Sequence, residues 1–255
     1  MTLSPILTIA RYTLLEALRN RLVWLLLLIA LAAVGLSGFL GEVALTESRQ
    51  LQAALLAATL RCAAVFLMIA FVVTSMLREA GDKGLELLLA LALPRAAYLL
   101  GKLCGFAGLA LLPALLFGAL CLFFSPAADC ALWAVSLLCE LWIVAAFSLL
   151  CVLSFSQALP ALAASSAFYL LARSIGGLQL IGHGPYNSHA PSQQLINAGI
   201  DLVAAVLPRL DQFTRTEWLV YHGGAAALPA ILAQTAIYVG LMTAAALFDF
   251  YRKSI

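Results

Sequence analysis

The sequence predicts an all-α protein that crosses a membrane several times. Of its 255 residues, 64% are hydrophobic and only 10% are charged, and the mean hydropathy is +1.05. Soluble domains are roughly 45–50% apolar and about 25% charged, so a water-soluble globule of this size could not bury so many apolar side chains. The low charge equally excludes a disordered chain and a nucleic-acid-binding protein. We therefore expect a single transmembrane domain over residues 1–255.

Six continuous apolar runs supply the expected spans. A helix needs roughly 20 apolar residues to cross about 30 Å of hydrocarbon, and continuous rather than alternating runs exclude a β-barrel. The fifth run is interrupted by Arg173 and by Gly176 and Gly177, so a short span and a span followed by a re-entrant piece both fit. The expected spans are Leu22–Leu40, Ala54–Met76, Leu100–Phe124, Ala131–Phe155, Ala158–Ile181 and Ala226–Phe248.

Residues 1–21 precede the first span and have the pattern of an amphipathic helix. Ser4 is a typical helix cap, and Pro5 suits the first helical position. We expect this helix to lie along the inner membrane surface, because its arginines would otherwise enter hydrocarbon. The first span lacks a small-residue cleavage site, so we expect it to be retained rather than removed as a signal peptide. The apolar positions at helical spacing are Ile6, Ile9, Ala10, Thr13, Leu14 and Ala17.

Residues 77–100 form a connection that combines charge with exposed leucine. Residues 78–84 are charged and contain two glycines, whereas Leu85–Leu93 is apolar around Glu86. Apolar side chains outside a membrane must be buried, either beneath the helix bundle or on a partner. The later connection 182–225 is long for a simple loop, and we expect interfacial helices there or a surface for another protein.

The distribution of lysine and arginine predicts the orientation. Nine of these residues lie in the amino-terminal segment, the connection 77–100 with its flanks, and the tail, whereas four lie on the other side. The positive-inside rule then places both termini in the cytoplasm, as an even number of spans requires. We expect a multi-pass protein of the inner (plasma) membrane, with 182–225 facing outward.

Side chains that carry enzyme chemistry are not arranged in recognisable motifs. A phosphate-binding loop before Gly101 and Lys102 would need glycine where Ala96 stands and a hydroxyl residue where Leu103 stands. No hydrolase or metalloprotease motif is present either, so we expect no enzymatic activity, no cofactor and no catalytic residue. Three loop histidines, His183, His189 and His222, could form a metal site, but such histidines are more often solvated, and we predict none.

The six cysteines and two charged residues lie within apolar runs. The cysteines have the positions of small buried hydrophobes, although Cys121 and Cys130 flank an outer hairpin and could pair if their Cα atoms approach within about 7 Å. Arg61 and Glu140 lie inside the second and fourth spans, where a charge costs roughly 2.5–3.5 kcal/mol. Three interpretations stay open: the two residues line a transport path, they pair with each other, or Arg61 extends to the outer headgroups.

Three stretches resemble the permeases of type-2 ATP-binding cassette (ABC) exporters. They are Arg11–Arg21 before the first span, Arg78–Leu91 followed by Pro94-Arg95 and Gly101-Lys102, and the tail Phe248–Lys253. Within that family, the long outward loop and residues 207–213 are most similar to the permease subgroup of nitrous-oxide-reductase maturation.

The resemblance implies a transport subunit that exports a substrate with energy from a separate ABC ATPase subunit, which would hold ATP and magnesium. It also implies a cytoplasmic coupling helix within 77–100, between the second and third spans, and a second permease copy, most simply a homodimer. An alternative is a non-transporting membrane scaffold or assembly factor that anchors extracytoplasmic proteins through 182–225. The expected ATPase interface comprises Arg19, Glu79, Asp82, Lys83, Glu86, Leu88, Pro94 and Arg95.

Overall fold

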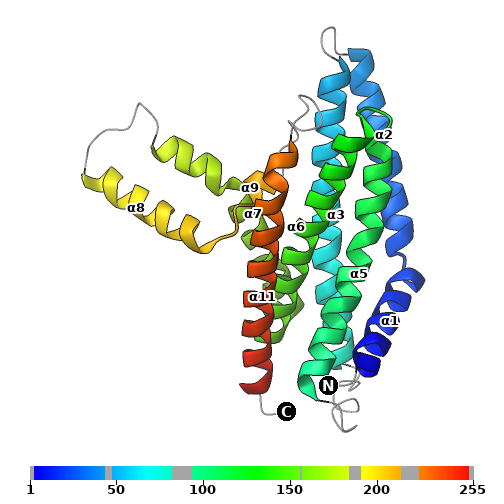
Figure 1. Ribbon diagram of the computed structural model, residues 1–255, viewed down its shortest axis with the longest axis vertical. Helices are drawn as coiled ribbons and strands as arrows, with labels where there is room; N and C mark the ends of the chain where they lie inside the picture. The colour runs from blue at the N-terminus through cyan, green and yellow to red at the C-terminus, as the bar shows by residue number, and fades with distance from the viewer. Residues whose placement is uncertain are drawn as a thin grey trace.

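The computed structural model describes residues 3–43, 48–81, 94–155, 157–183, 191–213 and 224–252, and every regular element in these ranges is helical (Figure 1). Five long apolar helices have the length and composition to cross a membrane. They are α3 (Ser48–Gly81), α5 (Arg95–Cys121), α6 (Ala127–Ser154), α7 (Ala158–Gly182) and α11 (Leu228–Arg252). The predicted all-α, multi-pass membrane fold is confirmed.

The first predicted span is part of a bent helix pair. Helix α1 (Leu3–Arg19) meets α2 (Leu22–Val43) at an angle of 55°, and the pair passes the same test only when it is taken together. Among the residues that the structure describes, five helices could therefore cross a membrane, or six if this pair counts as one span. The chain bends at Asn20, whose backbone N–H still bonds to the Glu16 carbonyl while its side-chain oxygen accepts from the Arg21 N–H.

Helix α6 lies at the centre of the bundle, with α3, α5, α7 and α11 packed around it. Helices that are apolar on all sides are typical of such a buried position, because every face meets another helix. The core contains Trp133 and Leu137 of α6, Phe106 of α5 and Leu60 of α3, all fully buried. By contrast, α2 packs mainly on α3 and exposes large apolar side chains along its length.

The amino-terminal helix packs against α5 through a row of small residues. A Cβ on Gly101 would lie 2.8 Å from the Ile9 Cβ, and a Cβ on Gly105 would lie 2.6 Å from the Thr13 Cβ. Spaced glycines let two helix backbones approach closely, as in small-residue contacts between transmembrane helices. The apolar face that the sequence suggested for the membrane surface therefore contacts α5.

The fifth predicted span is one continuous helix, because α7 runs unbroken through Arg173 and the two glycines. Its carboxyl-terminal end and α8 (Pro191–Val206) project sideways from the bundle as a helical arm (Figure 1). The Asn197 side-chain amide donates to the Gly182 carbonyl at 2.8 Å, and the Gln179 amide donates to Asp201 at 3.0 Å. Helix α8 lies within the connection 182–225, where the sequence led us to expect helices. Two short elements follow it, α9 (Leu210–Phe213) and the 3-10 helix η1 (Gly224–Ala227).

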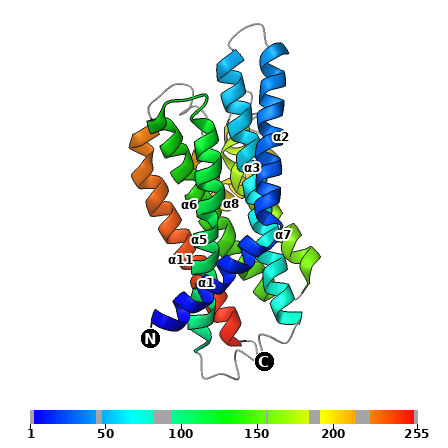
Figure 2. The same ribbon diagram turned by 90° about the vertical axis from the view of Figure 1, so that its right-hand side faces the viewer.

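Both ends of the chain lie at one end of the bundle. Figures 1 and 2 show the start of α1, the end of α3, the start of α5 and the end of α11 gathered there. This arrangement agrees with an even number of crossings. We call this region the terminal end of the bundle.

Candidate functional site

Charged and polar side chains gather at two places within the bundle. The first group, the end cluster, lies at the terminal end and joins α1, α3 and α5. The second, the mid-bundle cluster, joins α3 and α6 within the membrane-spanning part. The members of the end cluster are Glu16, Ser75, Arg78, Glu79, Tyr98 and Lys102, and those of the mid-bundle cluster are Arg61, Trp133, Ser136 and Glu140.

Glu16 connects α1 to the end of α3. Its Oε1 forms an ion pair with Arg78 Nη2 and accepts a hydrogen bond of 3.0 Å from the Ser75 hydroxyl. Its Oε2 lies 4.0 Å from the Lys102 Nζ of α5. One carboxylate therefore holds three helices that meet at the terminal end.

Glu79 and Lys102 form the second half of the end cluster. Lys102 Nζ lies 2.6 Å from Glu79 Oε2, and the Tyr98 hydroxyl donates to the same oxygen at 2.9 Å. The Lys102 side chain is only 5% exposed, so its charge depends on these carboxylates for compensation. Residues that are distant in sequence thus anchor the end of α3 to the start of α5.

The end of α11 joins the same region through Phe250. An Arg95 Nη1 donates to the Phe250 carbonyl at 3.4 Å, and the Phe250 ring stacks on Tyr98 with centroids 6.1 Å apart. The ends of α1, α3, α5 and α11 at this end of the bundle are therefore linked by specific contacts.

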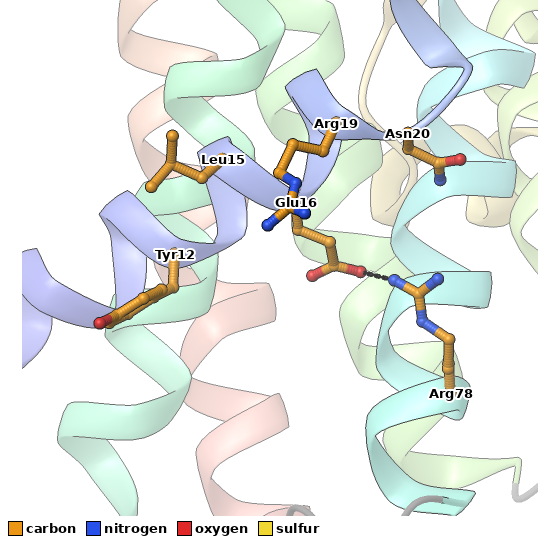
Figure 3. A pocket seen from close by; sticks show the side chains of 6 residues that line it. All are labelled: Tyr12, Leu15, Glu16, Arg19, Asn20 and Arg78. Carbon is orange, nitrogen blue, oxygen red and sulfur yellow. Dashed lines mark hydrogen bonds and ion pairs between the residues drawn. The ribbon is translucent and has the colours of Figure 1, made fainter.

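An open pocket of about 580 Å³ borders the end cluster where α1 turns into α2. Figure 3 shows that α1 and the bend after it supply most of its lining, with Arg78 of α3 facing them across the pocket. Arg19 extends into this region and makes no ion pair or hydrogen bond with any residue that the structure describes. The lining residues are Tyr12, Leu15, Glu16, Arg19, Asn20 and Arg78.

The predicted interface residues have different positions in the structure. Arg19 and Pro94 are exposed, whereas Glu79 and Arg95 are engaged within the chain by Lys102 and Phe250. Glu79 therefore links α3 to α5, a structural role that was not predicted from the sequence. Four of the predicted residues, Asp82, Lys83, Glu86 and Leu88, lie outside the described ranges, as do His189 and His222.

The mid-bundle cluster is centred on the ion pair between the two charged residues of the spans. Arg61 Nη1 lies 2.6 Å from Glu140 Oε2, and the two side chains are 1% and 0% exposed. Arg61 Nη2 also donates to the Ser136 hydroxyl at 2.8 Å, and the guanidinium lies 4.9 Å from the Trp133 ring centroid. The two residues do pair, and the interpretation that Arg61 extends to the headgroups is wrong, because its guanidinium is buried and bound inside the bundle.

The cysteines are free thiols in the structure. Cys121 and Cys130 are both buried, and Cys130 Sγ donates to the Ser125 carbonyl at 3.4 Å. The pairing that the sequence left open for these two residues is therefore not formed.

Several contacts of the end cluster could not be predicted from the sequence. Ser75, Tyr98, Lys102 and Phe250 were not expected to meet at one place, because helical periodicity carries no information on contacts between distant segments. The spacing of Gly101 and Gly105 is a signal that could have indicated the α1 contact, since small residues four apart permit close helix packing.

Comparison with known proteins adds no assignment. No protein-family model matches the chain, and no curated protein matches it.

Proposed function

We propose that this protein is the membrane-spanning subunit of an ABC exporter, driven by ATP that a separate subunit hydrolyses. In this proposal the protein lies in the inner membrane with both termini in the cytoplasm, and it forms a pair with a second permease copy. It rests first on the resemblance of three short stretches to type-2 permeases.

The observation that carries the proposal is that described residues of these three stretches meet in space. Glu16 of the first stretch pairs with Arg78 of the second, and within the second Glu79 binds Lys102. Phe250 of the tail contacts Arg95 and Tyr98. Segments that resemble a motor-coupled permease thus form one connected unit, which is the arrangement needed to pass a movement from a docked partner to several helices.

The need for an external motor follows from the chemistry of the chain. The glycine and hydroxyl residues of a phosphate-binding loop are missing around Lys102, and its ammonium is occupied by Glu79. Residues 82–93 connect α3 to α5 at the terminal end and contain the apolar run Leu85–Leu93, which suits a docking surface.

Co-purification tests the proposal. The tagged full chain, extracted from its native membrane in mild detergent, should bring down a protein that contains a phosphate-binding loop. Reversing the charge of Glu86 should reduce that recovery several-fold, because Glu86 lies in the proposed docking run. Glu79→Lys is a poor test, since it would also break the contact with buried Lys102.

Asp201→Lys is the control for charge reversal, because it reverses one half-exposed carboxylate on α8, away from the terminal end, whose described contacts are confined to Gln179 and His183 of the arm (Figure 1). Recovery of the ATPase should be unchanged in this variant. Absence of any such protein from the wild-type eluate would contradict the proposal, and so would equal losses in Glu86→Lys and Asp201→Lys.

The projecting arm favours a second candidate, a membrane scaffold that holds an extracytoplasmic protein. The arm exposes Leu180 and Ile181 of α7 and Leu195 and Leu202 of α8. A scaffold would retain a partner through the arm and need no ATPase. Loss of a co-purified protein in Asp201→Lys, together with normal recovery in Glu86→Lys, would favour this function over transport.

A further inference from the structure

The pocket at the bend between α1 and α2 combines a cationic lining with an open mouth. It is lined by two arginines, one tyrosine and one carboxylate. Glu16 is already matched by Arg78 and approached by Lys102, and Lys102 in turn is paired with Glu79. Arg19 is therefore the cation of this group that no described residue neutralises. The pocket has an excess of positive charge and is suited to an anion.

The donors around the pocket suit an oxyanion in particular. A guanidinium presents five N–H groups in a planar fork that matches phosphate oxygens. Arg78 uses Nη2 on Glu16, and 58% of its side chain remains exposed. Tyr12, 69% exposed, adds a hydroxyl at the edge. Figure 3 shows Arg19 and Arg78 on either side of Glu16, reaching the pocket from α1 and α3.

The position of the pocket next to an apolar helix indicates that the phosphate it binds belongs to a lipid headgroup. Arg21 is the last charged residue before the apolar α2, and Trp24, one turn later, is 75% exposed. Tryptophan is enriched at the boundary between headgroups and hydrocarbon, and arginines next to it lie at phosphate depth. Leu15 on the pocket wall is exposed, and Leu28 and Leu31, farther along α2, continue the exposed apolar surface that an acyl chain requires.

We infer that this pocket binds the phosphate of an anionic phospholipid, with Arg19 and Arg78 holding the headgroup and α2 contacting the acyl chain. The bound lipid would fix the angle between α1 and α2, because the headgroup contacts α1 while its tail lies along α2. This inference depends on the membrane fold and not on transport.

The test uses the purified full chain in nanodiscs of phosphatidylcholine that contain increasing phosphatidylglycerol. Retained phosphatidylglycerol is counted by native mass spectrometry after release from the disc. Arg19→Gln should weaken retention of this lipid about tenfold, as expected for the loss of one charge-assisted contact. Arg19→Lys, which keeps the charge and loses the fork, should fall between Arg19→Gln and the wild type.

Arg252→Gln is the matched control, since Arg252 is an exposed arginine at the terminal end and lies outside the pocket. It should retain phosphatidylglycerol like the wild type. Equal losses in Arg19→Gln and Arg252→Gln would mean general surface attraction and overturn the inference, as would no loss in Arg19→Gln. Since Arg19 contacts no described partner, a normal elution profile and helical content should accompany each variant.

Two further outcomes separate the lipid from other ligands. Inorganic phosphate, added to discs of pure phosphatidylcholine, should not compete at millimolar concentration, because it lacks the acyl chain. Binding of free phosphate as tight as that of the lipid would overturn the assignment to a phospholipid. Loss of ATPase recovery in Arg19→Gln with unchanged lipid retention would assign the pocket to the protein partner instead.

Discussion

The end cluster and the mid-bundle cluster use the same ion-pair chemistry in opposite surroundings. In the mid-bundle cluster, Arg61 and Glu140 are completely buried and form one pair. In the end cluster, Glu16 and Glu79 are partly exposed and share several partners with Arg78 and Lys102. Water reaches Glu16, Glu79 and Arg78 and screens their charges, although Lys102 is buried beneath them, whereas the buried pair of the mid-bundle cluster is closed to water and has no second charged partner among the described residues. The comparison suggests that the mid-bundle pair holds α3 and α6 in one arrangement, whereas the contacts among α1, α3 and α5 at the terminal end can rearrange.

The largest effect is expected from removing one member of the buried pair. Arg61→Leu or Glu140→Leu should lower the free energy of unfolding by about 3–5 kcal/mol, because the remaining charge is left buried without a counter-charge. Reversible unfolding in mixed detergent micelles, followed by the loss of helical signal, measures this.

The double variant sharpens that prediction. Arg61→Leu together with Glu140→Leu removes both charges, and it should be much more stable than the sum of the single changes predicts. If the two single losses simply add, the residues do not depend on each other, and the contrast between the clusters fails.

A smaller effect is expected at Glu79. Glu79→Gln keeps the hydrogen bond to Tyr98 and removes the charge facing Lys102, so unfolding should become easier by about 2 kcal/mol. Because this cluster lies near water, 1 M salt should reduce the difference between wild type and variant, whereas salt should leave the Arg61 effect unchanged.

Asp249→Asn serves as the control for Glu79, since Asp249 accepts one exposed hydrogen bond from Ser154 at 3.0 Å. It should change the free energy of unfolding little. A Glu79→Gln effect as large as that of Arg61→Leu, and equally insensitive to salt, would show that the end cluster is no more adjustable than the mid-bundle pair.

The smallest effect concerns packing at the terminal end. Gly105→Ala places a methyl group 2.6 Å from the Thr13 Cβ, so α1 must shift away from α5, at a cost of about 1–2 kcal/mol. Gly108→Ala is the control, because its nearest contact is Leu14 at 3.7 Å. Cross-linking between cysteines introduced at the α1–α5 contact should slow in Gly105→Ala only. Similar rates in both variants would mean that the ion pairs, and not the glycines, set the position of α1.

The sequence could predict the spans because hydrophobic length is a local property. The span expected at Leu100–Phe124 corresponds to helix α5, Arg95–Cys121, which begins five residues earlier because the polar flank before the apolar run is helical as well. The pairing of Arg61 with Glu140 was one of three interpretations, because two isolated charges in hydrocarbon have few partners. The contacts of Lys102 and Tyr98 were not predictable, since they depend on how α1, α3 and α5 approach one another. Residues 82–93 remain the part of the proposed interface that rests on sequence alone.

The proposed function requires an ATP-hydrolysing partner that acts on the terminal end. Its most direct test is the rate of magnesium-dependent ATP hydrolysis, measured on the full chain purified from native membranes together with the proteins that co-elute with it. We predict hydrolysis that stays with the chain through size-exclusion chromatography and falls several-fold in Glu86→Lys but not in Asp201→Lys. Purified material without ATPase activity, from cells in which the chain is folded and abundant, would contradict the claim.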